Sequence, residues 1–187
     1  MGDSLTEGAG ADSPDTTWPA ILAAKWREKG CKVQLKNAGI SGHTSDGVLQ
    51  DEVPQLKTTK ATIITLQVGG NDIVQKVPDE TYRANVKAIL AAAKSEGARI
   101  VTMPQNDWYR SPEGKAYAAG APERRAALEG ILEEETKAAG GEFVNLRALF
   151  KAQADAEMWH EGDIHPTQEA YTQWGNEMAR VIPAPCK

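Results

Sequence analysis

The chain has 187 residues, of which 41% are hydrophobic and 17 are glycine, a size that suits one domain with a sizeable core and is short for two. Its formal net charge of -5 comes from acidic residues spread along the chain, which argues against nucleic acid or an anionic membrane as a partner. No apolar run approaches the roughly 20 residues of a membrane-spanning helix. We therefore predict one domain over residues 1–187 without a membrane span.

Two cysteines, Cys31 and Cys186, lie far apart and lack the spacing of metal ligands. Free thiols are the favoured interpretation, and a disulfide that ties the C-terminal tail to the first strand after the nucleophile loop is the alternative. No signal-peptide pattern precedes Gly2. The sequence leaves the compartment open: cytoplasmic as given, and secreted or periplasmic if a leader is removed.

The first third of the chain is predicted as loop, helix, strand and loop. Residues 7–16 are small, acidic and rich in glycine, as in a surface loop. Residues 18–29 show helical spacing of apolar side chains, with proline in the first turn and glycine at the end. Residues 32–36 alternate apolar and polar side chains, which predicts a short strand, and a glycine-rich loop follows over 37–45.

The remainder alternates helices with strands. Residues 61–68 are β-branched and almost continuously apolar, which is typical of a strand buried on both faces of a parallel sheet. The other expected elements are a helix over 46–56, a helix over 79–96, a strand over 99–103, a helix over 122–139, a strand over 142–146 and a helix over 167–181. This alternation predicts a central parallel sheet covered by helices on both faces.

Two features leave this outline incomplete. Residues 105–121 are irregular and contain Trp108, Tyr109 and Tyr117, and they are predicted either as a mobile flap near the site or as a packed surface loop. A nucleophile at the end of a first, central strand needs roughly four to six apolar residues ahead of Gly2, and only Met1 stands there. We expect a missing or truncated first strand, with the nucleophile poorly held and the sheet open in its middle.

The candidate catalytic residues lie in loops at or near the carboxyl ends of the predicted strands, where parallel sheets bind ligands. Ser4 needs a histidine base and donors for the oxyanion that it creates, because a serine hydroxyl alone is a poor nucleophile. His165 is the expected base, since a proline and a helix start follow it, and His43 and His160 lack both. Gly42 allows close approach of its backbone N–H, and Asn71 offers an uncharged amide.

These motifs, in this order, resemble those of the GDSL or SGNH hydrolases. They are Gly2-Asp3-Ser4-Leu5, Gly39-Ile40-Ser41-Gly42, Gly69-Gly70-Asn71-Asp72 and His165-Pro166. The first is not the elbow of α/β-hydrolases, since Thr6 stands where the second glycine belongs. The resemblance covers nearly the whole chain, is closest to the bacterial thioesterase and arylesterase branch, and implies a three-layer α/β/α, flavodoxin-like sandwich around a parallel sheet.

The resemblance also implies roles for individual residues. Ser4 is expected to be the nucleophile and His165 the base, and the oxyanion hole is expected to consist of the backbone amides of Ser4 and Gly42 with the side chain of Asn71.

The third triad member departs from the family pattern Asp-x-x-His, because the position three residues before His165 is Gly162. Asp163 is the first choice for the acid. Glu161, or a backbone carbonyl with a Ser-His dyad, remains open.

The predicted function is a serine esterase that hydrolyses short-chain acyl or acetyl esters. Acyl thioesterase or lysophospholipase activity is the alternative, and a catalytically silent binding module on the same fold is another. Aromatic side chains in residues 105–121 are candidates for stacking on a sugar or aryl group. No cysteine cluster, His-x-x-x-His pair or Walker-type loop is present, so we predict a small-molecule ester as partner and no metal or other cofactor.

Overall fold

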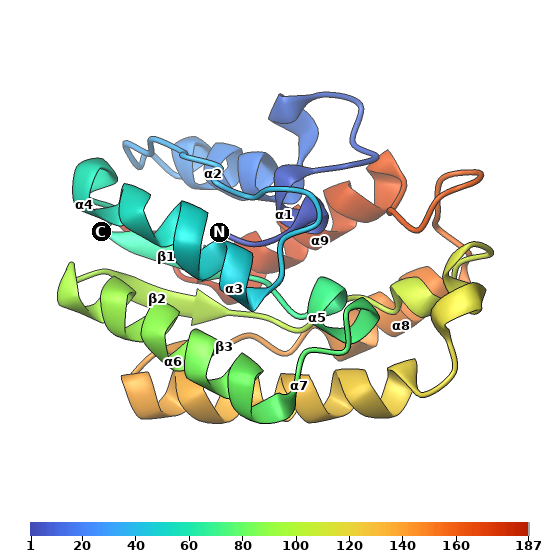
Figure 1. The fold of residues 1–187 in the computed structure, drawn as a ribbon. Helices are drawn as coiled ribbons and strands as arrows, with labels where there is room; N and C mark the ends of the chain where they lie inside the picture. Colours follow the sequence, from blue (N-terminus) through green and yellow to red (C-terminus); the bar gives the residue numbers. More distant parts are fainter. Residues whose placement is uncertain (187) are drawn as a thin grey trace.

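The computed structural model describes residues 1–186 and has a helix-rich α/β fold around a three-stranded parallel sheet (Figure 1). The strands are β1 (Ile63–Leu66), β2 (Arg99–Thr102) and β3 (Glu142–Phe143), in that spatial order. Both pairings are parallel. Helices connect one strand to the next, because parallel neighbours need a long crossover.

The helices are α1 (Ser4–Glu7), α2 (Trp18–Glu28), α3 (Ser45–Gly47), α4 (Leu56–Thr59), α5 (Gly70–Val74), α6 (Asp79–Ser95), α7 (Ala121–Ala139), α8 (Arg147–Asp155) and α9 (Gln168–Val181). The predictions of α2, α6, α7 and α9 are confirmed to within about two residues. The predicted helix over 46–56 is divided into α3, a π-helical turn, a 3-10 turn and α4. The helices α1, α5 and α8 were not predicted, and the first two are too short to show a helical period.

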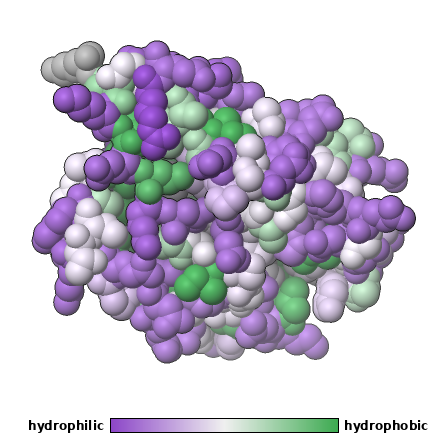
Figure 2. Space-filling model, turned by 90° about the horizontal axis from the view of Figure 1, so that it is seen from above, coloured by the Kyte–Doolittle hydropathy of each residue, from purple (hydrophilic) through white to green (hydrophobic). Residues whose placement is uncertain are grey.

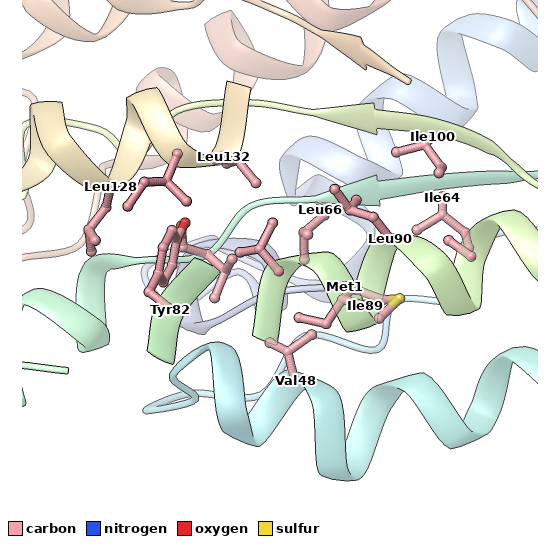
Figure 3. Close-up of a cluster of buried hydrophobic side chains, with 14 of the residues drawn as sticks. Met1, Val48, Ile64, Leu66, Tyr82, Ile89, Leu90, Ile100, Leu128 and Leu132 are labelled. Carbon is pink, nitrogen blue, oxygen red and sulfur yellow. The ribbon is translucent and has the colours of Figure 1, made fainter. Parts of the chain in front are cut away.

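Separate hydrophobic cores cover the two faces of the sheet, which confirms the predicted three-layer arrangement. Ile64 and Leu66 pack with side chains of α6 and α7 on one face, in a cluster that includes the fully buried Tyr82 (Figure 3). Val101 and Met103 belong to the other core, together with side chains of α2, α8 and α9. Because successive strand residues point to opposite faces, the nearly continuous apolar run of β1 fills both cores.

The first strand is reduced to one bridge beside β1. Gly2 pairs with Gln67 in parallel, and the N–H of Gln67 donates to the Met1 carbonyl at 3.3 Å. The Met1 nitrogen donates to the Thr65 carbonyl at 2.9 Å. The expectation of a truncated first strand is therefore confirmed. The sheet is not open in its middle, however, because β1, β2 and β3 are contiguous and the short first-strand segment lies at the outer side of β1.

Residues 32–36 do not form the predicted strand. A groove of about 540 Å³ separates them from β1, so their backbone has no neighbouring strand with which to form a ladder. Figure 2 looks onto this side of the molecule and shows apolar side chains inside a hollow of the surface. Leu35 is accordingly 42% exposed. Alternation of apolar and polar residues predicts the faces of a strand only where a partner strand exists.

The two cysteines form a disulfide, so the prediction of free thiols is wrong. The Cα atoms of Cys31 and Cys186 are 5.4 Å apart. The pairing depends on α9 lying along α2, where Trp18 and Trp174 stack with ring centroids 5.1 Å apart. The tail after α9 therefore returns to the segment just beyond the end of α2, a proximity that the sequence separation of 155 conceals.

The stretch 105–121 is a packed loop rather than a flap. It contains two 3-10 turns, Trp108–Arg110 and Gly114–Tyr117. Trp108 and Tyr109 are buried against Ala121, the first residue of α7. Over residues 1–186 we find no helix with the length and apolar character needed to cross a membrane.

Candidate active site

Ser4 begins the short helix α1 immediately after the bridge to β1. The Asp3 side chain caps this helix by accepting the N–H of Leu5 at 3.0 Å. Gly2 has a φ of +147°, and a Cβ at this position would lie 2.2 Å from the Gln67 carbonyl oxygen, so only glycine lets the chain pass so close to β1. The expectation that Ser4 is poorly held is thus wrong, because the cap and the bridge hold it on both sides.

His165 lies in the loop between α8 and α9 and contacts Ser4 directly. Its Nε2 is 2.9 Å from the Ser4 Oγ, and its Nδ1 is 2.7 Å from Oδ1 of Asp163. Gly162 has a φ of +71°, and the N–H of Asp163 donates to the His160 carbonyl at 3.2 Å. This local turn brings a carboxylate only two residues before His165 onto the imidazole, whereas Glu161 is exposed.

The surroundings of Asp163 stabilise the ionised form of its carboxyl group. Partial burial raises the pKa of this carboxyl, but the hydrogen bond and charge of His165, together with the backbone amides of Ile164 and His165, outweigh burial. The net pKa of Asp163 lies below its usual value. An ionised carboxylate at Nδ1 orients the imidazole with Nε2 toward the serine hydroxyl.

Asn71 lies in the first turn of α5, at the carboxyl end of β1. Its Nδ2 donates to the His43 carbonyl at 3.0 Å. Since an amide NH₂ carries two hydrogens, the second is left for a substrate oxygen. Asn71, Ser4 and His165 line the same cavity.

Gly42 belongs to a loop beside this cavity, with a φ of +84° and space for a Cβ. In the part of the chain that the structure describes, neither Gly42 nor His43 lines the cavity. The loop is joined to the nucleophile segment through the N–H of Ile40, which donates to the Gly2 carbonyl at 3.0 Å. Four of the five predicted site residues, Ser4, His165, Asp163 and Asn71, are therefore in direct contact or line one cavity. Gly42 does not line it, but its loop is hydrogen-bonded to the nucleophile segment.

Three buried carboxylates, Asp3, Asp72 and Glu52, lie around the site and were not predicted from the sequence to have a role. Asp3 accepts from Nε2 of Gln105 at 3.0 Å, and burial raises the pKa of Asp3 to about 7. Asp72 accepts the N–H and the hydroxyl of Ser45, the latter at 2.6 Å. Asp3 and Asp72 are themselves members of the motifs Gly2-Asp3-Ser4-Leu5 and Gly69-Gly70-Asn71-Asp72, so the sequence could have indicated a role for them. Glu52 lay in a predicted helix and showed no such signal.

The cavity beside Ser4 is small, about 30 Å³. Val74, Trp108 and Ile164 form its apolar wall. Of the three aromatic residues considered for stacking, only Trp108 lines it, and the Trp108 side chain is buried. Among residues 1–186, no three histidine, cysteine, aspartate or glutamate side chains cluster as a metal ion requires.

Comparison with known proteins places these features in a family context. Residues 1–173 match the GDSL-like lipase/acylhydrolase family. Esterase TesA of Pseudomonas aeruginosa is 28% identical over 134 residues, which are 68% of this chain. Thioesterase 1/protease 1/lysophospholipase L1 of Escherichia coli K12 is 32% identical over 183 residues, which are 97% of this chain.

The matched lengths differ between the two relatives. The chain spans 66% of the Pseudomonas protein, just under two thirds, and 81% of the Escherichia protein. A crystal structure of TesA superposes with a TM-score of 0.78 at 22% identity, over 95% of this chain and 92% of that one. The likeness in fold therefore extends over nearly the whole chain, and the relatives support ester hydrolysis as the chemistry of the site.

Proposed function

We propose that this chain, which belongs to the GDSL-like lipase/acylhydrolase family, is a serine esterase that hydrolyses short-chain carboxylic esters. The observation that carries the proposal is the hydrogen-bonded series from the Ser4 hydroxyl through His165 to Asp163, with distances of 2.9 and 2.7 Å. Distances of this kind are within the range over which a base takes the proton of a nucleophile.

The reaction follows from these positions. The Ser4 Oγ attacks the ester carbonyl while Nε2 of His165 takes the hydroxyl proton, and Asp163 stabilises the resulting imidazolium. The tetrahedral oxyanion is stabilised by the backbone N–H groups of Ser4 and Gly42 and by the Asn71 amide. His165 then gives its proton to the leaving alcohol, and a water molecule activated by the same imidazole releases the acid.

The size of the cavity favours a short acyl group. The enclosed part of the cavity, about 30 Å³, is small, which favours a methyl or ethyl group beside Ser4 over a long acyl chain. Val74, which is 40% exposed, stands at this wall. Acetyl and propionyl esters are therefore the preferred substrates.

Two other functions make different predictions for the hydrolysis of esters of increasing acyl-chain length. The Escherichia relative is named a thioesterase and lysophospholipase, and a long-chain activity predicts rising kcat/KM as the acyl chain lengthens. A silent binding module predicts no hydrolysis that depends on Ser4. The small cavity argues against the long-chain alternative, and the pairing of Ser4 with His165 argues against the silent module.

The test is hydrolysis of p-nitrophenyl acetate, butyrate and octanoate by the wild-type chain and by Ser4→Ala. We expect kcat/KM to fall from acetate to octanoate, and the Ser4→Ala protein to retain only the uncatalysed background. Equal rates for the two proteins contradict the serine esterase. A rate that rises toward octanoate moves the function to long-chain acyl substrates.

A further inference from the structure

Glu52, at the end of the π-helical turn Val48–Glu52, joins two parts of the site that are distant in sequence. Its side chain is completely buried. One carboxylate oxygen, Oε2, accepts the N–H of Gly2 at 2.8 Å, two residues before Ser4. The other, Oε1, is 3.0 Å from Nδ1 of His43, the residue that follows Gly42. One carboxylate thus contacts both the nucleophile segment and the loop that carries the proposed oxyanion donor.

His43 extends this link to Asn71. The His43 ring is held on its other side by Asp51, whose Oδ2 is 3.3 Å from Nε2. The ring also packs against Gly47, where a Cβ would come within 2.9 Å of it. With the ring held, the backbone of His43 is fixed as well, and its carbonyl accepts the Nδ2 hydrogen of Asn71 at 3.0 Å.

We propose that Glu52 is a positioning residue, which sets the distance between Ser4 and the oxyanion donors at Gly42 and Asn71. This inference rests on the proposed esterase function. Glu52 lies behind the site, because it is fully buried and is absent from the cavity lining among residues 1–186. It therefore acts through Gly2 and His43 and not on the substrate.

The free-energy cost of burying the Glu52 carboxylate supports a role in positioning the site. Removing a carboxylate from water is expensive, and apolar side chains of similar volume often replace a buried ionic group without loss of stability. Burial accordingly raises the pKa of Glu52, against the lowering effects of the nearby terminal ammonium, the Gly2 amide and His43. A group with this cost contributes most where placement is critical, since a shift of about 1 Å in a catalytic site can cost about 100-fold in rate.

The experiment compares Glu52→Gln with Glu135→Gln, using p-nitrophenyl acetate and thermal unfolding. Glu135 is also a buried carboxylate, but it lies on α7 and pairs with Arg83, away from the cavity. For Glu52→Gln we expect kcat to fall about 10- to 100-fold with KM changed less than about twofold. Glu135→Gln is expected to keep the wild-type kcat, although it also loses a buried charge.

A second variant cuts the same link at the other end. His43→Phe keeps a ring over Gly47 and removes both nitrogen atoms, and the His43 side chain is 15% exposed, so this variant answers the question if Glu52→Gln does not fold. We expect a kcat loss similar to that of Glu52→Gln. When both fold, the double variant is expected to lose no more than the worse single one, because the two residues act as one unit.

Each outcome has a defined meaning. A wild-type kcat in folded Glu52→Gln or His43→Phe, or a loss that Glu135→Gln shares, overturns the positioning role and leaves the esterase intact. A lower unfolding temperature with unchanged kcat assigns Glu52 a merely structural role and also overturns it. Failure of the esterase itself is seen separately, as equal rates for the wild type and Ser4→Ala.

Discussion

Residues 32–36 and 37–44 follow each other in the chain, yet the structure holds them in different ways. In the second segment, Asn37 donates to the Thr6 carbonyl at 2.7 Å, and Ser41 donates to Glu7. In the first, within residues 1–186, the backbone of residues 32–36 accepts one side-chain hydrogen bond, from Nε of Arg27 to the Val33 carbonyl at 2.9 Å. The predicted strand is therefore the loosely held segment, and the predicted loop is the fixed one.

The difference teaches that hydrogen-bond partners decide order more than local pattern does. Residues 37–44 lie against the nucleophile segment, whose carbonyl groups and carboxylates satisfy their N–H groups. Residues 32–36 face a groove, and the disulfide of Cys31 is the covalent anchor beside them. We expect changes in residues 37–44 to alter catalysis, and changes around residues 32–36 to alter stability.

The largest expected effect is a loss of catalytic rate when the acid of the site is removed. Asp163→Ala should lower kcat for p-nitrophenyl acetate by roughly 10³- to 10⁴-fold, because the imidazole loses the carboxylate that orients it. Glu161→Ala is the matched control, and a change below about twofold is expected because its side chain is exposed. A larger loss in Glu161→Ala would transfer the role of the acid to Glu161.

A smaller effect is expected at the loosely held region. Cys186→Ser removes a crosslink over 155 residues and should lower the free energy of unfolding by about 4 kcal/mol, with kcat unchanged. Leu35→Ser, in the same region, should change stability by less than about 0.5 kcal/mol, because Leu35 is already exposed. Urea unfolding and the acetate assay measure both quantities. A substantial loss of kcat in Cys186→Ser would break the comparison, since it would couple the groove to the site.

The smallest of the three main effects concerns the stability that is lost when Asp3, which caps the nucleophile helix α1, becomes ionised. The pKa of Asp3 is about 7 in the folded protein against an ordinary 3.8, so the folded state binds the extra proton between these values. Stability therefore falls as pH rises toward 7, by about 3 kcal/mol between pH 5 and pH 8 at 1.36 kcal/mol per pH unit.

Urea unfolding of the wild type and Asp3→Asn at these two pH values tests the sign. The variant should lose this pH dependence, and the exposed control Asp12→Asn should keep it. A wild type that becomes more stable toward pH 8, with Asp3→Asn following it, would show that Asp3 is ionised throughout.

Much of the architecture could be predicted because it depends on local pattern. The apolar period of α6 and the β-branched run of β1 identify their elements without knowledge of their neighbours. The Cys31–Cys186 pair could not be predicted in this way, because it depends on how the tail after α9 returns to α2. The site shows the same division, since Ser4 and His165 belong to recognisable motifs, whereas Glu52 has no motif of its own.

By itself, the sequence determined the family, the alternation of helices and parallel strands, and the residue types available for catalysis. Motifs and periodicity are properties of neighbouring residues, so one chain suffices to read them. Only the tertiary structure decided that Asp163 reaches the imidazole through the turn at Gly162, that residues 32–36 stay unpaired, and that Glu52 lies between Gly2 and His43. Each depends on atoms from distant parts of the chain meeting within hydrogen-bond distance, and no local pattern encodes that meeting.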